Sequence, residues 1–225
     1  MKKVNRKKKR RLRRRIQMVC RLIILVLIVF GVFQIGKYVF HWPIFGNGYI
    51  ERTGEEIDAL RPELDVELLT INAYSRPALR SERIRNIVIH YTANPGTTAM
   101  QNRNYFEGLK DSHVTKASSH FIIGLEGEIV QCIPTAEISY ATNHRNSDTI
   151  SIETCHWKES GAYTDETYQS MVELTAWLCV KFDLTEQDVI RHYDVTGKIC
   201  PKYFVDHEDA WETFKQDVGK RIDEM

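Results

Sequence analysis

Two histidines and a cysteine have the residue types of a metal site. His90 ends the apolar run Asn86-Ile87-Val88-Ile89, and His192 and Cys200 share one short segment near the end of the chain. Neutral imidazoles and a thiolate suit zinc, and three protein ligands leave the fourth tetrahedral position open for water. A structural site would fill all four positions. We therefore predict one catalytic zinc ion (Zn2+).

Four short motifs place these residues in a wider pattern. They are Ile89-His90-Tyr91-Thr92-Ala93-Asn94, Ser119-His120-Phe121-Ile122-Ile123, Ile150-Ser151-Ile152-Glu153 and Gly197-Lys198-Ile199-Cys200-Pro201. In this order they resemble the zinc N-acetylmuramoyl-L-alanine amidases of the Amidase 2 family, which includes phage lysozyme-type amidases and peptidoglycan recognition proteins. The resemblance implies an α/β fold with a mixed central β-sheet flanked by α-helices. It also implies cleavage of the peptidoglycan amide between N-acetylmuramic acid and L-alanine.

The resemblance also assigns roles to individual residues. It makes His90, His192 and Cys200 the zinc ligands, Glu153 the carboxylate that activates water, and Lys198 the donor that stabilises the oxyanion. A carboxylate beside zinc can take a proton from water and return it to the leaving amine. A fixed positive charge stabilises the negative charge of a tetrahedral intermediate.

Asn143 and His144 resemble the loop that lines the substrate groove of the family, so we expect them to bind substrate. The chain departs from the phage branch at Ser119, where that branch has a tyrosine that contributes to catalysis. This departure gives Glu153 more weight in the expected mechanism. Four further histidines are interpreted as structural or surface residues: His113, His120, His156 and His207.

Three other functions compete with the amidase. A peptidoglycan sensor on the same fold would bind without turnover, because fold alone does not fix function. The complete ligand set with Glu153 and Lys198 favours the enzyme. A zinc peptidase of another class would need a helix with the H-E-x-x-H motif, which the sequence lacks. A purely structural membrane protein leaves the His and Cys placement unexplained.

The pattern from Asn86 onward predicts the elements that position the site. Short β-branched runs predict strands over residues 86–90, 120–123, 129–132 and 149–154, the middle two forming a hairpin. Alternation in the last of these places Glu153 on the face opposite Ile150 and Ile152. Apolar residues at helical spacing predict helices over residues 97–109, 164–182 and 206–222, with Thr164 and Asp206 as N-caps.

Charge is strongly polarised along the chain. The first 21 residues contain 12 of the 31 basic residues and no acidic one, so 19 basic and 30 acidic residues remain in 22–225. An apolar run follows from Leu22 to Phe40, close to the ~20 residues that a membrane-spanning helix needs. We predict a basic cytoplasmic segment over 1–21 and a transmembrane helix over 22–40.

This arrangement predicts the protein's location. By the positive-inside rule the basic end stays in the cytoplasm beside anionic lipid headgroups, and the rest lies outside the cell membrane. A cleaved signal peptide is disfavoured by the long basic region and the lack of a small-x-small cleavage site. A basic arm for nucleic acid is disfavoured by the apolar run that follows it, so we expect no nucleic acid partner.

Residues 41–84 have the composition of an extracytoplasmic stalk or wrapping arm, and 85–225 are long enough for one zinc amidase domain. We expect this domain to be monomeric. Among Cys132, Cys155 and Cys179 either one disulfide or three buried thiols would fit the sequence.

Overall fold

The computed structural model describes residues 18, 19, 21, 23 and 52–225. The chain divides into two units, Met1–Glu51 and Arg52–Met225, and the second contains every element described below. The predicted basic segment and transmembrane helix lie outside the described residues, apart from the four isolated positions. Within the described part of the chain, no helix has the length and apolarity needed to cross a membrane.

A six-stranded mixed sheet forms the centre of the second unit. Its strands lie in the order β1-β4-β3-β5-β2-β6. Their bounds are β1 Asp65–Val66, β2 Asn86–Ile89, β3 Phe121–Ile123, β4 Ile129–Gln131, β5 Thr149–Thr154 and β6 Val189–Arg191. Strands β3 and β4 form the predicted antiparallel hairpin, and β3, β5, β2 and β6 run parallel to one another.

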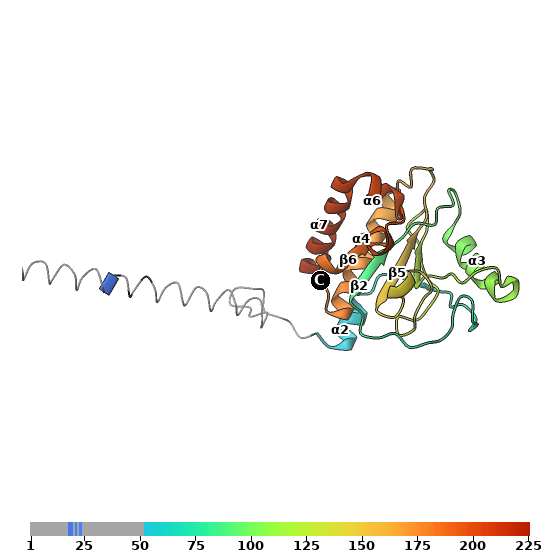
Figure 1. Ribbon diagram of the computed structural model, residues 1–225, viewed down its shortest axis with the longest axis horizontal. Helices are drawn as coiled ribbons and strands as arrows, with labels where there is room; N and C mark the ends of the chain where they lie inside the picture. The colour runs from blue at the N-terminus through green and yellow to red at the C-terminus, as the bar shows by residue number, and fades with distance from the viewer. Residues whose placement is uncertain (1–17, 20, 22, 24–51) are drawn as a thin grey trace, which may run out of the picture. The chain divides into compact units, whose positions relative to one another are not determined.

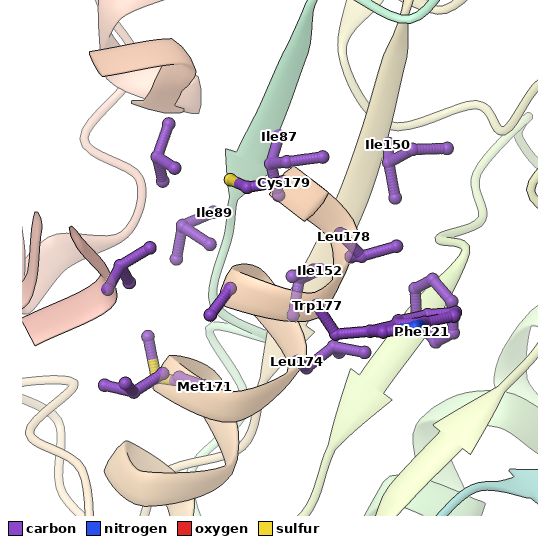
Figure 2. Close-up of a cluster of buried hydrophobic side chains, with 14 of the residues drawn as sticks. Ile87, Ile89, Phe121, Ile150, Ile152, Met171, Leu174, Trp177, Leu178 and Cys179 are labelled. Carbon is purple, nitrogen blue, oxygen red and sulfur yellow. The ribbon is translucent and has the colours of Figure 1, made fainter. Parts of the chain in front are cut away.

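Helices cover both faces of this sheet (Figure 1). Helix α3 (Ala99–Ser112) packs on one face, and α4 (Asp165–Phe182), α6 (Lys202–Asp206) and α7 (Glu208–Glu224) lie on the other. The larger core joins β2 and β5 to α4. Figure 2 shows its side chains meeting between the strands and the helix, among them Ile87, Ile89, Ile150, Ile152, Leu174 and Trp177. The predicted mixed sheet with flanking helices is confirmed.

The helix predictions succeeded where the end signals were local. Thr164 is the N-cap of α4, and its hydroxyl accepts a hydrogen bond from the backbone N–H of Thr167 at 3.0 Å. The prediction that Asp206 caps the last helix was wrong. Asp206 is the last residue of α6, and α7 begins after His207 without a side-chain cap. The chain turns here because Phe204 of α6 is buried in the larger core.

Strand β5 keeps the predicted alternation, but its polar face is not solvated. Ile150 and Ile152 point into the larger core, whereas Ser151 is fully buried among polar groups on the opposite side. The Ser151 hydroxyl lies 2.8 Å from that of Ser139 and 3.0 Å from Nδ1 of His120. Glu153 therefore follows a buried polar network along this face.

The segment before Asn86 belongs to the same unit as the sheet. Helix α2 (Gly54–Ala59) receives a hydrogen bond of 3.0 Å from Nε1 of Trp177 to the carbonyl of Ile57. Strand β1 pairs with β4, and Leu69 is buried in the smaller core against α3. From Arg52 onward this segment wraps the domain, so the unit begins earlier than the boundary expected at residue 85.

Candidate active site

Adjacent parallel strands bring the predicted site residues to one edge of the sheet. His90 directly follows β2, and His192 directly follows β6 as the first residue of α5 (His192–Thr196). Glu153 lies near the end of β5, which pairs with β2. The backbone N–H of His90 continues this pairing by donating to the carbonyl of Ile152 at 2.8 Å. Carboxyl ends of neighbouring parallel strands are where such folds bind ligands.

The three predicted metal ligands meet at this edge. Each of His90, His192 and Cys200 is buried, and their ligand atoms all lie within 4.8 Å of one another. Sγ of Cys200 is 3.8 Å from Nδ1 of His90, and the two imidazole centroids are 4.7 Å apart. With Zn–N of about 2.1 Å and Zn–S of about 2.3 Å, tetrahedral donors stand roughly 3.5 Å apart. The residues therefore fit a zinc ion.

A tight loop holds His192 and Cys200 together. The backbone N–H of Tyr193 donates to the carbonyl of Cys200 at 2.8 Å, which closes the loop at its base. Helix α5 ends at Gly197, whose φ of 75° is the left-handed conformation that glycine adopts without strain. The N–H of Gly197 donates to the Tyr193 carbonyl at 2.7 Å. The sequence places the turn and both ligands within nine residues.

The protonation states of the ligands follow from their burial. Burial and the neighbouring His192 hold the pKa of His90 well below its usual value, and burial followed by Lys198 lowers the pKa of His192. Both imidazoles are therefore neutral at pH 7, as metal ligands must be. Burial and the charge of Glu153 raise the pKa of the Cys200 thiol to about 12. A bound cation is needed to favour its thiolate.

Buried polar atoms without partners mark the same place. Nδ1 of His192 and Oε2 of Glu153 are both buried, and neither has a hydrogen bond partner. Burial raises the pKa of Glu153 to about 8, while the charge of Lys198 opposes this rise. Buried groups of this kind are rare without a ligand. They fit a site whose residues would bind a cation.

An open groove of about 740 Å³ runs beside the ligands. Asn143, His192 and Lys198 line it, and of these Asn143 was expected at the substrate groove. His144 is exposed and is not among the lining residues. Lysine and tyrosine side chains that the sequence did not single out also line the groove: Lys116 and Tyr140.

Lys116 and Tyr140 were not predicted because neither residue belongs to one of the motifs. The Lys116 ammonium lies 5.4 Å from the centroid of the Tyr140 ring, a cation–π contact across the groove wall. The nine lining residues include two lysines and no acidic residue. The only available signal was the position of Lys116 shortly before the Ser119-His120 motif.

The remaining candidates have structural positions. Ser119 is fully buried, and its hydroxyl lies 3.0 Å from the carbonyl oxygens of Phe121 and Ser151. Ser119 therefore hydrogen-bonds to the backbone of β3 and β5, and it is not among the residues that line the groove. His120 is bound on both ring nitrogens, to Ser151 and to the carbonyl of Glu137. In the described part of the chain all four cysteines are free and buried, so no disulfide forms among Cys132, Cys155 and Cys179.

The part of the chain that carries these residues is similar to a known protein family. A family described as N-acetylmuramoyl-L-alanine amidase matches residues 80–203, which is more than half of the chain and includes all the predicted site residues. The chain belongs to this amidase family. The matched range begins before β2 and ends after Cys200. It therefore contains β2 and β6, the histidine that follows each strand, and the loop from His192 to Cys200.

Two named relatives of the chain are amidases from Bacillus. The chain is 36% identical over 165 residues to the N-acetylmuramoyl-L-alanine amidase CwlL of Bacillus licheniformis, covering 68% of this chain and 45% of the relative. It is 30% identical over 175 residues to the amidase BlyA of Bacillus subtilis, covering 68% of this chain and 46% of the relative. The chain thus spans less than half the length of these relatives.

Solved structures share the amidase fold. PlyL aligns with a TM-score of 0.62 at 22% identity, over 71% of this chain and 99% of PlyL. The catalytic domain of XlyA aligns with a TM-score of 0.59 at 24% identity, over 70% of this chain and all of that domain. At this identity the likeness establishes the fold alone.

Proposed function

We propose that this chain is a membrane-anchored, zinc-dependent hydrolase that cleaves the amide between N-acetylmuramic acid and L-alanine in peptidoglycan. The observation that carries the proposal is the convergence of the buried His90, His192 and Cys200 beside Glu153, next to an open groove that His192 lines. Membership of the amidase family gives the substrate class. The relatives that cover most of this chain carry amidase names.

Three side chains would hold the metal. His90 and His192 offer neutral nitrogens, and Cys200 offers a thiolate once a cation compensates the burial of its charge. When bound, zinc supplies a Lewis acid that polarises the scissile carbonyl and acidifies water, and its charge favours the ionised form of Glu153. Of the three residues, His192 also lines the groove, where the substrate would bind.

Glu153 moves the proton. Its side chain is ionised when cations compensate its burial, and it then accepts a proton from the attacking water. The same carboxyl group returns that proton to the amino group of L-alanine as the C–N bond breaks. The balance is closed, because water adds its oxygen to the lactyl carbonyl carbon and its two protons end on the products.

Lys198 and the groove bind the substrate and its transition state. Lys198 is exposed on the rim beside His192, where its ammonium stabilises the oxyanion that forms at the scissile carbonyl. The second groove lysine, Lys116, favours a substrate with carboxylate groups along the peptide. A cationic groove suits the acidic stem peptides of peptidoglycan.

The anchor places this reaction outside the cell. We propose that residues 22–40 cross the bilayer, that the basic segment 1–21 stays with anionic headgroups in the cytoplasm, and that the domain acts as a monomer on the nearby wall. A tether raises the local concentration of the enzyme on wall within its reach. Nucleic acid has no part in this proposal.

Digestion of purified muropeptides by the detergent-solubilised full chain tests the proposal. We expect intact glycan and new L-alanine amino termini by mass spectrometry, lost after chelation and restored by zinc. The Glu153→Gln variant should retain zinc and lose most turnover. Cleaved glycan would refute the proposal, and zinc-independent binding without any product would indicate the sensor.

A further inference from the structure

The loop that precedes β5 contacts the imidazoles of both His90 and His192 at Nε2. Asn143 of its short helix η1 (Asn143–Arg145) contacts Nε2 of His192, and the preceding Thr142 contacts Nε2 of His90. We propose that Asn143 is a positioning residue that fixes the tautomer and the orientation of His192 for metal binding. This inference rests on the zinc site of the proposed function and not on its substrate.

The hydrogen bond between Asn143 and His192 carries the argument. Oδ1 of Asn143 lies 2.8 Å from Nε2 of His192. An amide oxygen can only accept, so Nε2 of His192 donates and carries the ring proton. The lone pair of the neutral ring is then on Nδ1, the buried atom without a hydrogen bond partner. Asn143 thereby leaves one defined nitrogen free for the metal.

His90 is arranged in the same way. Its Nδ1 faces Sγ of Cys200 at 3.8 Å, and its Nε2 lies 3.5 Å from the hydroxyl of Thr142. Two consecutive loop residues therefore contact Nε2 of the two imidazoles, which leaves Nδ1 of each ring free to bind the metal. This repetition favours a metal-orienting role for the loop over a fortuitous contact of one exposed amide.

The loop is built to hold this position. Oδ1 of Asn146 accepts from the backbone N–H groups of Ala141 and Thr142 at 3.2 and 2.7 Å. Arg145 donates to Asp148 at 2.8 Å and to Oδ1 of Asn86 at 2.7 Å, which ties the loop to the start of β2. These contacts keep the backbone of the loop fixed relative to the strand that leads to His90.

Asparagine suits the backbone at position 143. Its φ of 56° lies in the left-handed region, where asparagine, aspartate and glycine are tolerated better than other residues. Glycine at this position removes the acceptor without adding strain, and aspartate keeps an acceptor oxygen in the same place. The chain thus allows a matched pair of variants that separates the hydrogen bond from the backbone conformation.

Zinc affinity of the full-length protein tests the inference. Competition with a chromophoric chelator should show Asn143→Gly binding zinc about 10- to 100-fold more weakly, the usual effect of losing a partner behind a metal histidine. Asn143→Asp should stay within a few-fold of the unchanged protein. The visible absorption of the Co2+-loaded protein should change with Asn143→Gly and be restored with Asn143→Asp.

Asp183→Gly is the control, because Asp183 also has a φ of 56° but lies at the C-cap of α4. Its zinc affinity should equal that of the unchanged protein. The inference is overturned if Asn143→Gly binds zinc normally, or if Asn143→Asp is as weak as Asn143→Gly. Failure of muropeptide cleavage with this affinity pattern intact would refute the proposed amidase alone.

Discussion

At the scale of single residues, the burial of Glu153 opposes the charge that its proposed role requires. Its Oε2 is buried without a partner, and burial raises the pKa of the carboxyl to about 8 while Lys198 opposes that rise. A carboxyl group of this kind needs nearby positive charge before it can act as a base. The three ligands are positioned to hold that charge.

The raised pKa of Glu153 predicts how stability depends on pH in the metal-free protein. The unfolded carboxyl ionises near its ordinary value of 4.5, whereas the folded one stays protonated until about 8. Glu153 therefore stabilises the fold below pH 4.5, and this contribution is lost as pH rises toward 8. Replacing it with glutamine removes the dependence.

Urea denaturation of the metal-free protein at pH 5 and pH 8 measures this effect. Between pH 5 and pH 8 the unfolding free energy of Glu153→Gln should rise by roughly 2 kcal/mol relative to that of the unchanged protein. This figure is smaller than the full pKa shift would give, because the Glu153 side chain is partly exposed to solvent. A difference that does not change with pH would contradict the raised pKa.

Lys198 is predicted to act on the transition state and not on the metal. Lys198→Ala should lower turnover about 100-fold, comparable to the loss of one oxyanion donor, while bound zinc measured by atomic absorption stays unchanged. Lys198→Arg keeps the charge and should recover part of the activity. A parallel loss of zinc and turnover would instead give Lys198 a structural role.

At the scale of elements, the junction of β6 and α5 sets the position of His192. The preceding residue, Arg191, has a side chain only 8% exposed. Its guanidinium donates to both carboxylate oxygens of Asp194, at 3.2 and 3.0 Å, and to the carbonyl of Phe204 at 3.0 Å. It also lies 5.3 Å from the centroid of the Trp211 ring. Arg191 thus joins the ligand loop to α6 and α7.

Arg191→Met is predicted to destabilise this junction. The substitution removes the guanidinium donor from the Phe204 carbonyl and leaves Asp194 with the backbone N–H of residue 191, which should cost about 3 kcal/mol of unfolding free energy in denaturant titration. Zinc affinity should fall as well, because His192 is the next residue. Arg191→Lys keeps the charge but not the fork of donors, so it should be intermediate. Unchanged stability of the methionine variant would contradict this account.

At the scale of the whole molecule, the division of the chain at Glu51 separates the folded unit from the segment that we propose as an anchor. The basic and apolar N-terminal composition predicts both membrane attachment and its direction. Since the reaction of the proposed function needs peptidoglycan, the unit from Arg52 to Met225 has to reach the outer side of that membrane.

Fractionation of bacterial cells tests the anchor. We expect the full chain to sediment with membranes, to resist extraction by high salt and to be released by detergent. Protease added outside intact spheroplasts should degrade the domain. A chain beginning at Arg52 should appear in the soluble fraction. Release of the full chain by salt, or its protection from external protease, would contradict a single-pass anchor with the domain outside.

The sequence determined much of this protein on its own. The candidate metal-binding residues were singled out by their side-chain chemistry and by the family motifs, and the strands, the hairpin and α4 follow from local periodicity and the Thr164 cap. Such features depend on neighbours within a few residues, so a single chain displays them. The family followed in the same way, because its motifs are short and contiguous.

Only the tertiary structure decided what depends on distant contacts. The break between α6 and α7 depends on where Phe204 packs, which is why Asp206 was misassigned as a cap. The burial that raises the pKa of Glu153, the groove position of Lys116, and the bond from Asn143 to His192 all join residues far apart in sequence. Periodicity carries no information about such pairs, because side-chain burial and hydrogen bond partners are set by packing between elements.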